Sequence, residues 1–405
     1  MNSLKMNISS MKRVNRRIVL NMIRKYPGIT RKEISNLTGM DPSTVTKIVT
    51  DLLKNGFILE NGEKSFPGRG RRGIRLVVNP NAINGLVVAI GVQKSCVGLA
   101  KFDGSYELIE SFETPQNFFD FIHKISDIIK SFIKDVVGLS FSIPGIVDMK
   151  KGIIRNAPHL KWKEMELRKL ILETIDNLDP EMIMMDNEAK LCLVAESWFN
   201  EKIKGLKNGV YIYQSEGVGG ALLINGEVYH GEDYIAGEIG HMIVDPNGKK
   251  CHCGNKGCWE TLISTEAIVQ SYEYAYGELK GDSYNEKFLT LVSMNSKRAK
   301  GVLMRMADYV SIGILNILNV IDPQFVLFGG MMYSLPDYLV ERIENTVKSQ
   351  VLIPDMMKTK ILKASMDIDE ARIKGGALIL INKYREDNGA CGSKRDRQDN
   401  LRARW

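Results

Sequence analysis

The stretches GEIGHM (residues 237–242) and CHCGNKGCWE (residues 251–260) decide the fold of this chain. They bring one histidine, His241, close in sequence to three of the six cysteines, Cys251, Cys253 and Cys258. Zinc binds such nitrogen and sulfur ligands in a tetrahedron, and a shell closed by three cysteines and one histidine leaves no position for a reactive water. The spacing therefore predicts a structural Zn2+ ion, which holds together a loop that has little hydrophobic core of its own.

The residues around these ligands favour the same interpretation. Gly254 and Gly257 allow the loop to turn tightly around an ion. His252 is an alternative ligand, but it lies between two cysteines, so we expect its ring to point away and favour His241. Three free cysteines in an ordinary loop are the alternative to a metal site.

The composition indicates a soluble globular protein with two or three domains. Of the 405 residues, 44% are hydrophobic and 25% are charged, and one domain usually takes about 100–200 residues. No run of about 18 apolar residues indicates a membrane span, and the first residues lack the apolar core of a signal peptide. We therefore expect a cytoplasmic protein with no membrane contact, in which clustered cysteines bind metal rather than form disulfides.

The positive charge of the chain is concentrated at the N-terminus. Residues 1–75 contain 16 Lys and Arg against 5 Asp and Glu, whereas the other 330 residues carry a net charge of −4. A basic module on a mildly acidic body indicates contact with nucleic acid through the first part of the chain. A solvated basic helix would give the same count.

The first 80 residues have the pattern of a winged helix-turn-helix domain. Apolar residues at helical spacing predict a first helix over residues 14–26. Thr30 and Glu33 form a capping box for a short second helix, and Asp41-Pro42 is typical of the start of a third. Two strands, 57–60 and 74–78, then flank a wing. Helix, short helix, turn and helix is the helix-turn-helix pattern.

Polar and basic side chains of this domain are the candidates for contact with double-stranded DNA. The third helix offers hydroxyl donors and a cation near its N-terminus, where contacts in the major groove are made. The wing loop PGRGRRG, residues 67–73, has arginines between glycines, which suit a narrow minor groove. The expected DNA-binding residues are Arg31, Lys32, Ser43, Thr44, Thr46, Lys47, Arg69, Arg71 and Arg72. A wing that touches only phosphates and a winged helix that binds protein are the alternatives.

The rest of the chain alternates between short apolar runs and helical patterns, which is typical of an α/β fold. Helical patterns cover residues 118–132 and 190–199. Buried strands are predicted over residues 86–90, 136–142, 182–185, 210–213 and 325–328.

The motif Gly237-Glu-Ile-Gly-His241, followed by Cys251-x-Cys-Gly-x-x-Gly-Cys-x-Glu260, resembles the signature of the ROK family (repressors, open reading frames and kinases). The resemblance covers residues 12 to about 383, and the helix-turn-helix marks the repressor branch, typified by xylose-responsive repressors. It implies a mostly helical DNA-binding domain over residues 1–80 and two actin-like, ribonuclease-H-like α/β lobes with a sugar cleft over 81–383. Residues 384–405 are polar and are expected to form a disordered tail.

Three stretches depart from the kinases of this family. Ala89-Ile-Gly-Val-Gln-Lys94 stands where the kinases carry Asp-Ile-Gly-Gly-Thr-Lys, and Ser215-Glu-Gly-Val-Gly-Gly220 stands where they carry Gly-Thr-Gly-x-Gly-Gly. Asn187-Glu-Ala-Lys190 replaces Asn-Asp-x-Asn, whose Asp is the catalytic base. Glu216 would also repel phosphate, at a cost on the order of 4 kcal/mol for each like-charge pair. We therefore expect no enzymatic activity, with a sugar kinase carrying a DNA-binding domain as the alternative.

The sugar side of the implied cleft is better preserved. The resemblance assigns sugar contacts to Gly145, Asn187, Glu188, Glu238, His241 and Glu260. His241 would be shared between metal and sugar, because a histidine bound to zinc through one nitrogen orients the other. His159 stands where the kinases usually carry Asn, so a sugar contact is not expected from it.

Together these features predict a sugar-responsive repressor of carbohydrate-utilisation genes. A free monosaccharide, with xylose slightly favoured, would release it from operator DNA. A homodimer or tetramer would place two recognition helices in successive major grooves. A DNA-binding protein that is insensitive to sugar is a further alternative.

Overall fold

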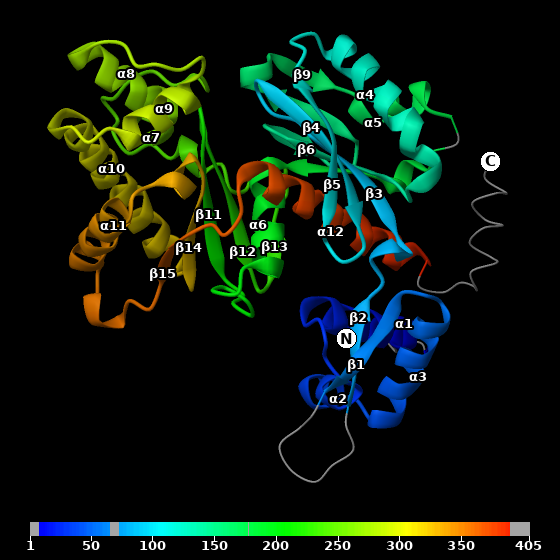
Figure 1. The fold of residues 1–405 in the computed structure, drawn as a ribbon. Helices are drawn as coiled ribbons and strands as arrows, with labels where there is room; N and C mark the ends of the chain where they lie inside the picture. Colours follow the sequence, from blue (N-terminus) through cyan, green and yellow to red (C-terminus); the bar gives the residue numbers. More distant parts are fainter. Residues whose placement is uncertain (1–7, 65–72, 177, 389–405) are drawn as a thin grey trace, which may run out of the picture.

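The computed structural model describes residues 8–64, 73–176 and 178–388. Its N-terminal part has the predicted winged helix-turn-helix order (Figure 1), with α1 (Ile8–Lys25), α2 (Arg31–Thr38), α3 (Pro42–Lys54), β1 (Ile58–Lys64) and β2 (Gly73–Val78). The first helix begins six residues earlier than expected, because residues 8–13 contain only two apolar residues, Ile8 and Met11, which are too few to predict a helix by themselves.

The predicted caps of α2 and α3 are confirmed. The backbone NH of Glu33 donates to Thr30 Oγ1 at 3.3 Å, and the Thr30 NH donates to Glu33 Oε2 at 2.9 Å. At α3, Asp41 accepts from the backbone NH of Ser43 at 2.8 Å. Each cap satisfies backbone donors that have no partner inside the helix, and this fixes where the helix begins.

The N-terminal lobe is built on a five-stranded sheet in the order β10-β6-β3-β4-β5. β3 pairs with β4 and β4 with β5 in antiparallel fashion, whereas β6 and β10 join in parallel. The helices α4 and α5 and a small sheet of β7, β8 and β9 complete the lobe. The bounds are β3 (Asn84–Ala89), β4 (Lys94–Lys101), β5 (Tyr106–Glu113), α4 (Phe118–Phe132), β6 (Leu139–Ile143), β7 (Ile146–Asp148), β8 (Ile153–Ala157), β9 (Trp162–Met165), α5 (Leu167–Thr174) and β10 (Ile183–Asn187).

The C-terminal lobe is built on a second five-stranded sheet, in the order β13-β12-β11-β14-β15. Five helices accompany it. The bounds are β11 (Gly209–Gln214), β12 (Val218–Ile224), β13 (Glu227–Tyr229), α7 (Glu260–Ile263), α8 (Thr265–Tyr276), α9 (Tyr284–Ser293), α10 (Lys297–Ile321), β14 (Phe325–Gly330), α11 (Asp337–Gln350) and β15 (Lys360–Lys363).

Helix α10 is long and apolar enough to cross a membrane by length and composition. More than half of its most apolar window, 56%, is buried inside the protein, where Val302, Met306 and Val310 join the core of the C-terminal lobe. It therefore occupies the position of a core helix.

The two large sheets have the same topology, although the sequence shows no short-period repeat. In each, a meander of three antiparallel strands is extended by two parallel strands beside its first member. The five predicted strands and both predicted helices are confirmed, with ends shifted by up to three residues. This repetition places the turn after β3 and the turn after β11 at equivalent positions of the two lobes.

Two helices, α6 (Glu188–Phe199) and α12 (Ile368–Asn388), lie between the lobes (Figure 1). They cross where Gly375 of α12 meets α6, and a Cβ atom on Gly375 would lie 2.0 Å from the carbonyl oxygen of Leu191. α12 continues five residues beyond Lys383, into the segment that was expected to form a tail, and residues 389–405 of that segment lie outside the described residues. Its residues Ile373, Ala377 and Ile381 share one hydrophobic core with the N-terminal domain.

Candidate functional site

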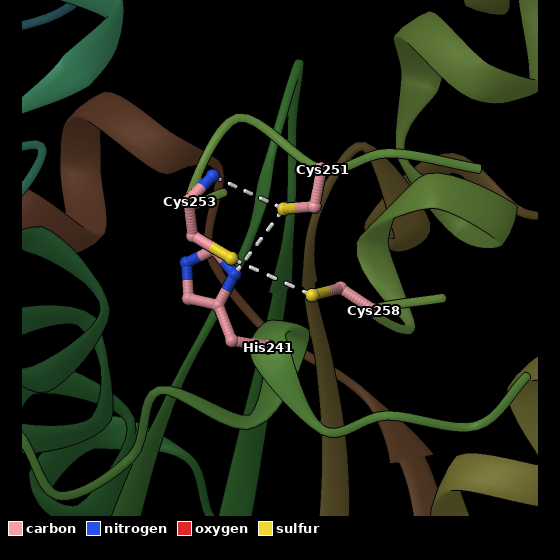
Figure 2. Close-up of side chains that lie close together, drawn as sticks. All are labelled: His241, Cys251, Cys253 and Cys258. Carbon is pink, nitrogen blue, oxygen red and sulfur yellow. Dashed lines mark hydrogen bonds between the residues drawn. The ribbon is translucent and has the colours of Figure 1, made fainter. Parts of the chain in front are cut away.

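His241 and the three cysteines predicted to bind zinc lie together (Figure 2). Their candidate ligand atoms all lie within 4.8 Å of one another. Cys251 Sγ is 3.6 Å from His241 Nδ1, and Cys253 Sγ is 3.6 Å from Cys258 Sγ. Sulfur atoms about 2.3 Å from one tetrahedral Zn2+ ion would be roughly 3.8 Å apart. The donor types and their spacing therefore fit zinc.

The local backbone explains how the loop brings these ligands together. Gly257 has φ of 69°, and a Cβ atom there would lie 1.5 Å from the carbonyl oxygen of Asp245. The Gly257 carbonyl in turn accepts from the NH of Val244 at 2.9 Å. Only glycine fits this position, which holds the segment after His241 against the cysteine loop.

His252, the alternative ligand, lies outside this group. Its side chain is 72% exposed, and its Nε2 is 3.7 Å from Glu266 Oε2. The expectation that its ring points away from the cysteines is therefore confirmed by the geometry.

All six residues expected to contact sugar line one cavity of about 390 Å3 beside the metal group. Gly145 and Asn187 come from the N-terminal lobe, Glu188 begins α6, and Glu238, His241 and Glu260 come from the C-terminal lobe. No side chain fits at Gly145 without a shift of the backbone, because its Cβ would lie 2.3 Å from the Asn156 carbonyl oxygen. A chamber of this size between two lobes suits a small polar ligand.

Two carboxylates of this cavity differ in how they are held. Glu260 Oε1 accepts from the Cys251 thiol at 2.8 Å and lies 3.6 Å from His241 Nδ1, while its Oε2 accepts from the Val218 NH at 3.4 Å. Glu238 has no hydrogen-bond partner for its carboxylate within the described residues. Burial raises the pKa of Glu238, while His241 and Lys190 act against this rise. Because Nδ1 of His241 faces Cys251, its Nε2 is the ring nitrogen left for a ligand.

Asn187 and Lys190 hold the walls of the cavity in place. The Asn187 side chain accepts from the NH groups of Ala189 and Lys190, capping α6, and its Nδ2 donates to the Gly145 carbonyl at 3.0 Å. The Lys190 ammonium is buried and donates to the Tyr234 carbonyl at 2.9 Å. Tyr234 has φ of 63°, a strained value for a residue with a side chain, in the loop that leads to Glu238.

Glu188 also lines a second cavity, of about 560 Å3, on the side of the cleft that corresponds to the two phosphate loops. Its Oε2 accepts from the Tyr213 hydroxyl and from Arg372 Nη1, each at 3.2 Å. Arg372 is 5% exposed and also donates to the Ile90 carbonyl and to Asp369. Burial raises the pKa of Glu188, and Arg372 is the main influence against this rise. One oxygen of the Glu188 carboxylate is thus occupied by hydrogen bonds from protein side chains.

The turns after β3 and β11 contact each other across the cleft. Gln93 Nε2 donates to Glu216 Oε1 at 3.3 Å, joining residues 123 positions apart. Both residues belong to the stretches that depart from the kinase loops. This hydrogen bond between the turns occupies two polar side chains that would otherwise face a ligand.

Sequence reasoning missed Arg372, Tyr213 and Asn156 as residues of the cleft. Arg372 lies in the run IDEARIKGGALIL beside two acidic residues and a lysine, so the sequence does not mark it as the member of a buried ion pair. His159, for which no sugar contact was expected, lines the same cavity, and its ring centroid is 6.2 Å from that of His252.

On the DNA-binding domain, the expected contact residues of α3 lie on its outer side. Ser43, Thr46 and Lys47 are exposed and Thr44 is half-buried, and the Thr46 hydroxyl donates to the Pro42 carbonyl at 2.8 Å. On α2, Lys32 is exposed, whereas Arg31 pairs with Glu60 of β1 at 3.0 Å. Arg69, Arg71 and Arg72 lie outside the described residues.

Most of the chain matches a known family. Residues 86–383 match the ROK family, and residues 13–58 match the winged helix-turn-helix DNA-binding family. The chain belongs to the ROK family. The resemblance drawn from the cysteine motif is thereby confirmed, together with the winged helix-turn-helix that precedes the ROK domain.

Several ROK proteins with DNA-binding names are similar to this chain over almost all its length. The xylose repressor of Bacillus subtilis is 29% identical over 381 residues, which cover 92% of this chain and 96% of that protein. The DNA-binding transcriptional dual regulator NagC of Escherichia coli is 23% identical over 391 residues, covering 93% and 94%.

Solved structures show the same fold. A ROK family transcriptional regulator, described as a homologue of the E. coli MLC protein, superposes with a TM-score of 0.74 at 23% identity, over 94% of this chain and 100% of that one. A ROK glucokinase from Streptomyces griseus, solved with glucose and AMPPNP, has a TM-score of 0.63 at 20% identity and covers 73% of this chain and 98% of its own. The two-lobed fold is thus common to regulators and kinases, and fold alone does not separate them.

Proposed function

We propose that this ROK protein is a sugar-responsive, cytoplasmic repressor of carbohydrate-utilisation genes, which binds operator DNA and leaves it when a free monosaccharide enters the cleft. One observation carries the proposal. A winged helix-turn-helix shares a hydrophobic core with a two-lobed domain whose metal-side cavity keeps a carboxylate, that of Glu238, free for a ligand. The names of the similar repressors support the same conclusion and slightly favour xylose.

In this proposal the sugar is held by hydrogen bonds to its hydroxyl groups. Glu238 and Glu260 would accept from hydroxyls, and His241 Nε2 would add a contact from the metal side. A site built to pair with hydroxyls discriminates strongly against molecules that lack them. A zinc ion held by His241, Cys251, Cys253 and Cys258 would keep the cysteine loop, and with it His241 and Glu260, in position.

On the DNA side, Lys and Arg residues would bind phosphates, and Ser43, Thr44, Thr46 and Lys47 would read base edges. Arg31, Lys32 and the wing arginines 69, 71 and 72 belong to the same proposed surface. A homodimer or tetramer would present two α3 helices to successive major grooves. Closure of the lobes around the sugar would change the spacing of these helices, with a coupling of about 1–3 kcal/mol.

The proposal includes the absence of kinase activity. The Gln93–Glu216 bond and the enclosed Glu188 support this, since the groups of the phosphate side are engaged with protein. The alternative, a sugar kinase with an appended DNA-binding domain, predicts ATP consumption that depends on a pentose or hexose.

The test is fluorescence anisotropy of the full-length protein on labelled DNA from upstream of its own gene, at fixed salt. D-xylose, D-glucose and N-acetylglucosamine are added one at a time, and a scrambled duplex of equal length is the control. We expect specific binding that one sugar weakens by about 5–150-fold. Binding that no sugar changes contradicts the sensor function, and sugar-dependent ADP release establishes the kinase alternative.

A further inference from the structure

Helix α6 starts at the sugar cavity and ends at the DNA-binding domain. Its 12 residues span about 18 Å at 1.5 Å per residue. At its first turn, Asn187 bonds the Gly145 wall and Lys190 bonds the Tyr234 carbonyl in the loop that carries Glu238. Both walls of the cavity are therefore attached to one end of this helix.

The other end of α6 contacts the DNA-binding domain through aromatic rings and cations. Arg24 of α1 is 5% exposed, and its guanidinium carbon lies 5.1 Å from the centroid of the Trp198 ring, in the last turn of α6. The same carbon lies 5.8 Å from the Phe102 ring, after β4. Just beyond α6, the Lys204 ammonium lies 4.7 Å from the Tyr26 ring. The end of α1 thus rests on the end of α6.

The middle of α6 is held tightly enough to move as one body. The close crossing at Gly375 leaves no space between α6 and α12. Glu196 accepts from the backbone NH groups of Ser365 and Met366 at 2.8 and 3.0 Å, which fixes α6 to the segment that leads into α12. Because packed interiors are dense and resist compression, a displacement of the first turn reaches the last turn instead of being absorbed on the way.

We propose that α6 transmits occupancy of the sugar cavity to the DNA-binding domain, and that Arg24, between Phe102 and Trp198, is the residue through which α1 responds. The inference rests on the proposed function and names how that site is regulated. A sugar that draws the Glu238 loop and the Gly145 wall together moves the first turn of α6. Trp198 then moves relative to Phe102, and α1 changes its orientation on the N-terminal lobe.

The first test is Arg24→Met, which keeps an unbranched apolar stem and removes the charged guanidinium. D-xylose affinity, measured by calorimetry on the full-length protein, is expected to stay within about twofold of wild type. The release of upstream DNA by D-xylose is expected to fall below about threefold, against about 5–150-fold for typical coupling between two sites. Trp198→Phe keeps a smaller ring, and the release of DNA by D-xylose in this variant is expected to lie between that of Arg24→Met and that of wild type.

Lys124→Met is the matched control. The Lys124 ammonium lies 5.4 Å from the Phe112 ring on the surface of the N-terminal lobe and also pairs with Glu110, so this variant loses a cation–ring contact and a surface ion pair away from α6. It is expected to keep the full release. Full release in Arg24→Met and Trp198→Phe, with both proteins folded by thermal melting, would overturn the inference.

A second test needs no sugar and separates this inference from the proposed function. Operator-region affinity is measured for Arg24→Met, Lys190→Met and the double variant. Substitutions that far apart ordinarily combine within about twofold, whereas transmission through α6 predicts a departure of at least about threefold from additivity. Additive effects overturn the inference. A wild-type protein that no sugar releases, together with a non-additive cycle, counts against the proposed function alone.

Discussion

The two halves of the cleft differ in whether their carboxylates are paired with other protein groups. On the metal side, the Glu238 carboxylate lies in a cavity without a hydrogen bond from the described residues, next to Glu260 and His241. On the phosphate side, Glu188 is paired with Arg372 and Tyr213, and Glu216 with Gln93. Burying a charge without a partner is costly. A carboxylate kept open therefore indicates a site for a ligand, whereas paired groups stabilise the protein itself.

The largest effect should follow from loss of the metal ligands on the open side. Cys253→Ser is expected to abolish zinc binding, to weaken D-xylose binding by more than 100-fold and to lower the first thermal transition by on the order of 10 °C. Several kcal/mol of metal binding would be lost, and each is worth about 2–4 °C in a domain of this size. Zinc content by mass spectrometry and thermal melting measure the result.

His252→Ala is the matched control for this substitution. It changes an exposed residue between two of the ligands, so zinc content and the first thermal transition should stay as in wild type. Because His252 also lines the sugar cavity, the variant is a control for the metal and not for sugar affinity. A metal-free Cys253→Ser protein that still responds to sugar would refute a structural role for the metal.

On the closed side, Arg372→Met should mainly affect stability. The substitution leaves Glu188 buried without its cationic partner, and breaking such a pair costs about 3–5 kcal/mol. Arg155→Met is the comparison, because Arg155 also contacts two carboxylates, those of Asp148 and Glu164, but at the surface. For Arg155→Met we expect the free energy of unfolding to fall by less than about 1 kcal/mol. Equal losses in urea unfolding would mean that the Glu188 pair is not enclosed as described.

The difference between the halves also marks what a sequence can predict. The caps of α2 and α3 and the ligands around Cys251 depend on residues close in the chain, and spacing alone was sufficient for them. The family signature then placed Glu238 and Glu260 in the cleft. By contrast, Glu188 and Arg372 are 184 residues apart, and Gln93 and Glu216 are 123 apart. Such pairs depend on how the lobes pack, which no local pattern encodes.

The same limit explains two details that the sequence did not predict. The shared topology of the two sheets does not appear as a repeat in the sequence. A buried strand requires only apolar residues at alternate or successive positions, and many different sequences satisfy this. Arg31 was assigned to DNA only, yet it pairs with Glu60 at the base of the wing. That pairing became evident only when β1 was placed beside α2.

Glu238→Gln tests the open half directly. The amide keeps the shape and loses the charge, so sugar affinity should fall by about 10–100-fold, the value of a hydrogen bond to a charged group. Stability should not fall, because a buried charge without a hydrogen bond is removed. Glu232→Gln, an exposed residue of the same loop, is the control and should bind sugar as wild type does. Calorimetric titration with D-xylose measures both, and unchanged affinity in Glu238→Gln would place the sugar elsewhere.

The smallest expected effect concerns pH and the closed half. Burial raises the pKa of Glu216, His159 opposes the rise and Glu266 adds to it. The folded protein therefore still binds this proton at pH values where the unfolded chain, with an ordinary glutamate pKa of about 4.3, has already lost it. Stability from this group consequently decreases as pH rises from that value through the raised pKa of the folded state, and levels off above it.

Comparison with Glu216→Gln isolates this contribution, because the variant has no proton to lose there. The free energy of unfolding of wild type, relative to the variant, should fall as pH rises through this window. The change should be below about 1 kcal/mol, since solvent screens a half-exposed carboxylate. Glu227→Gln, an exposed residue of β13, should run parallel to wild type. If the free energy of unfolding of wild type instead rose relative to the variant, partners such as Gln93 would be stabilising the charged form. Hydrogen bonds to the Glu216 carboxylate would then outweigh the effect of its burial.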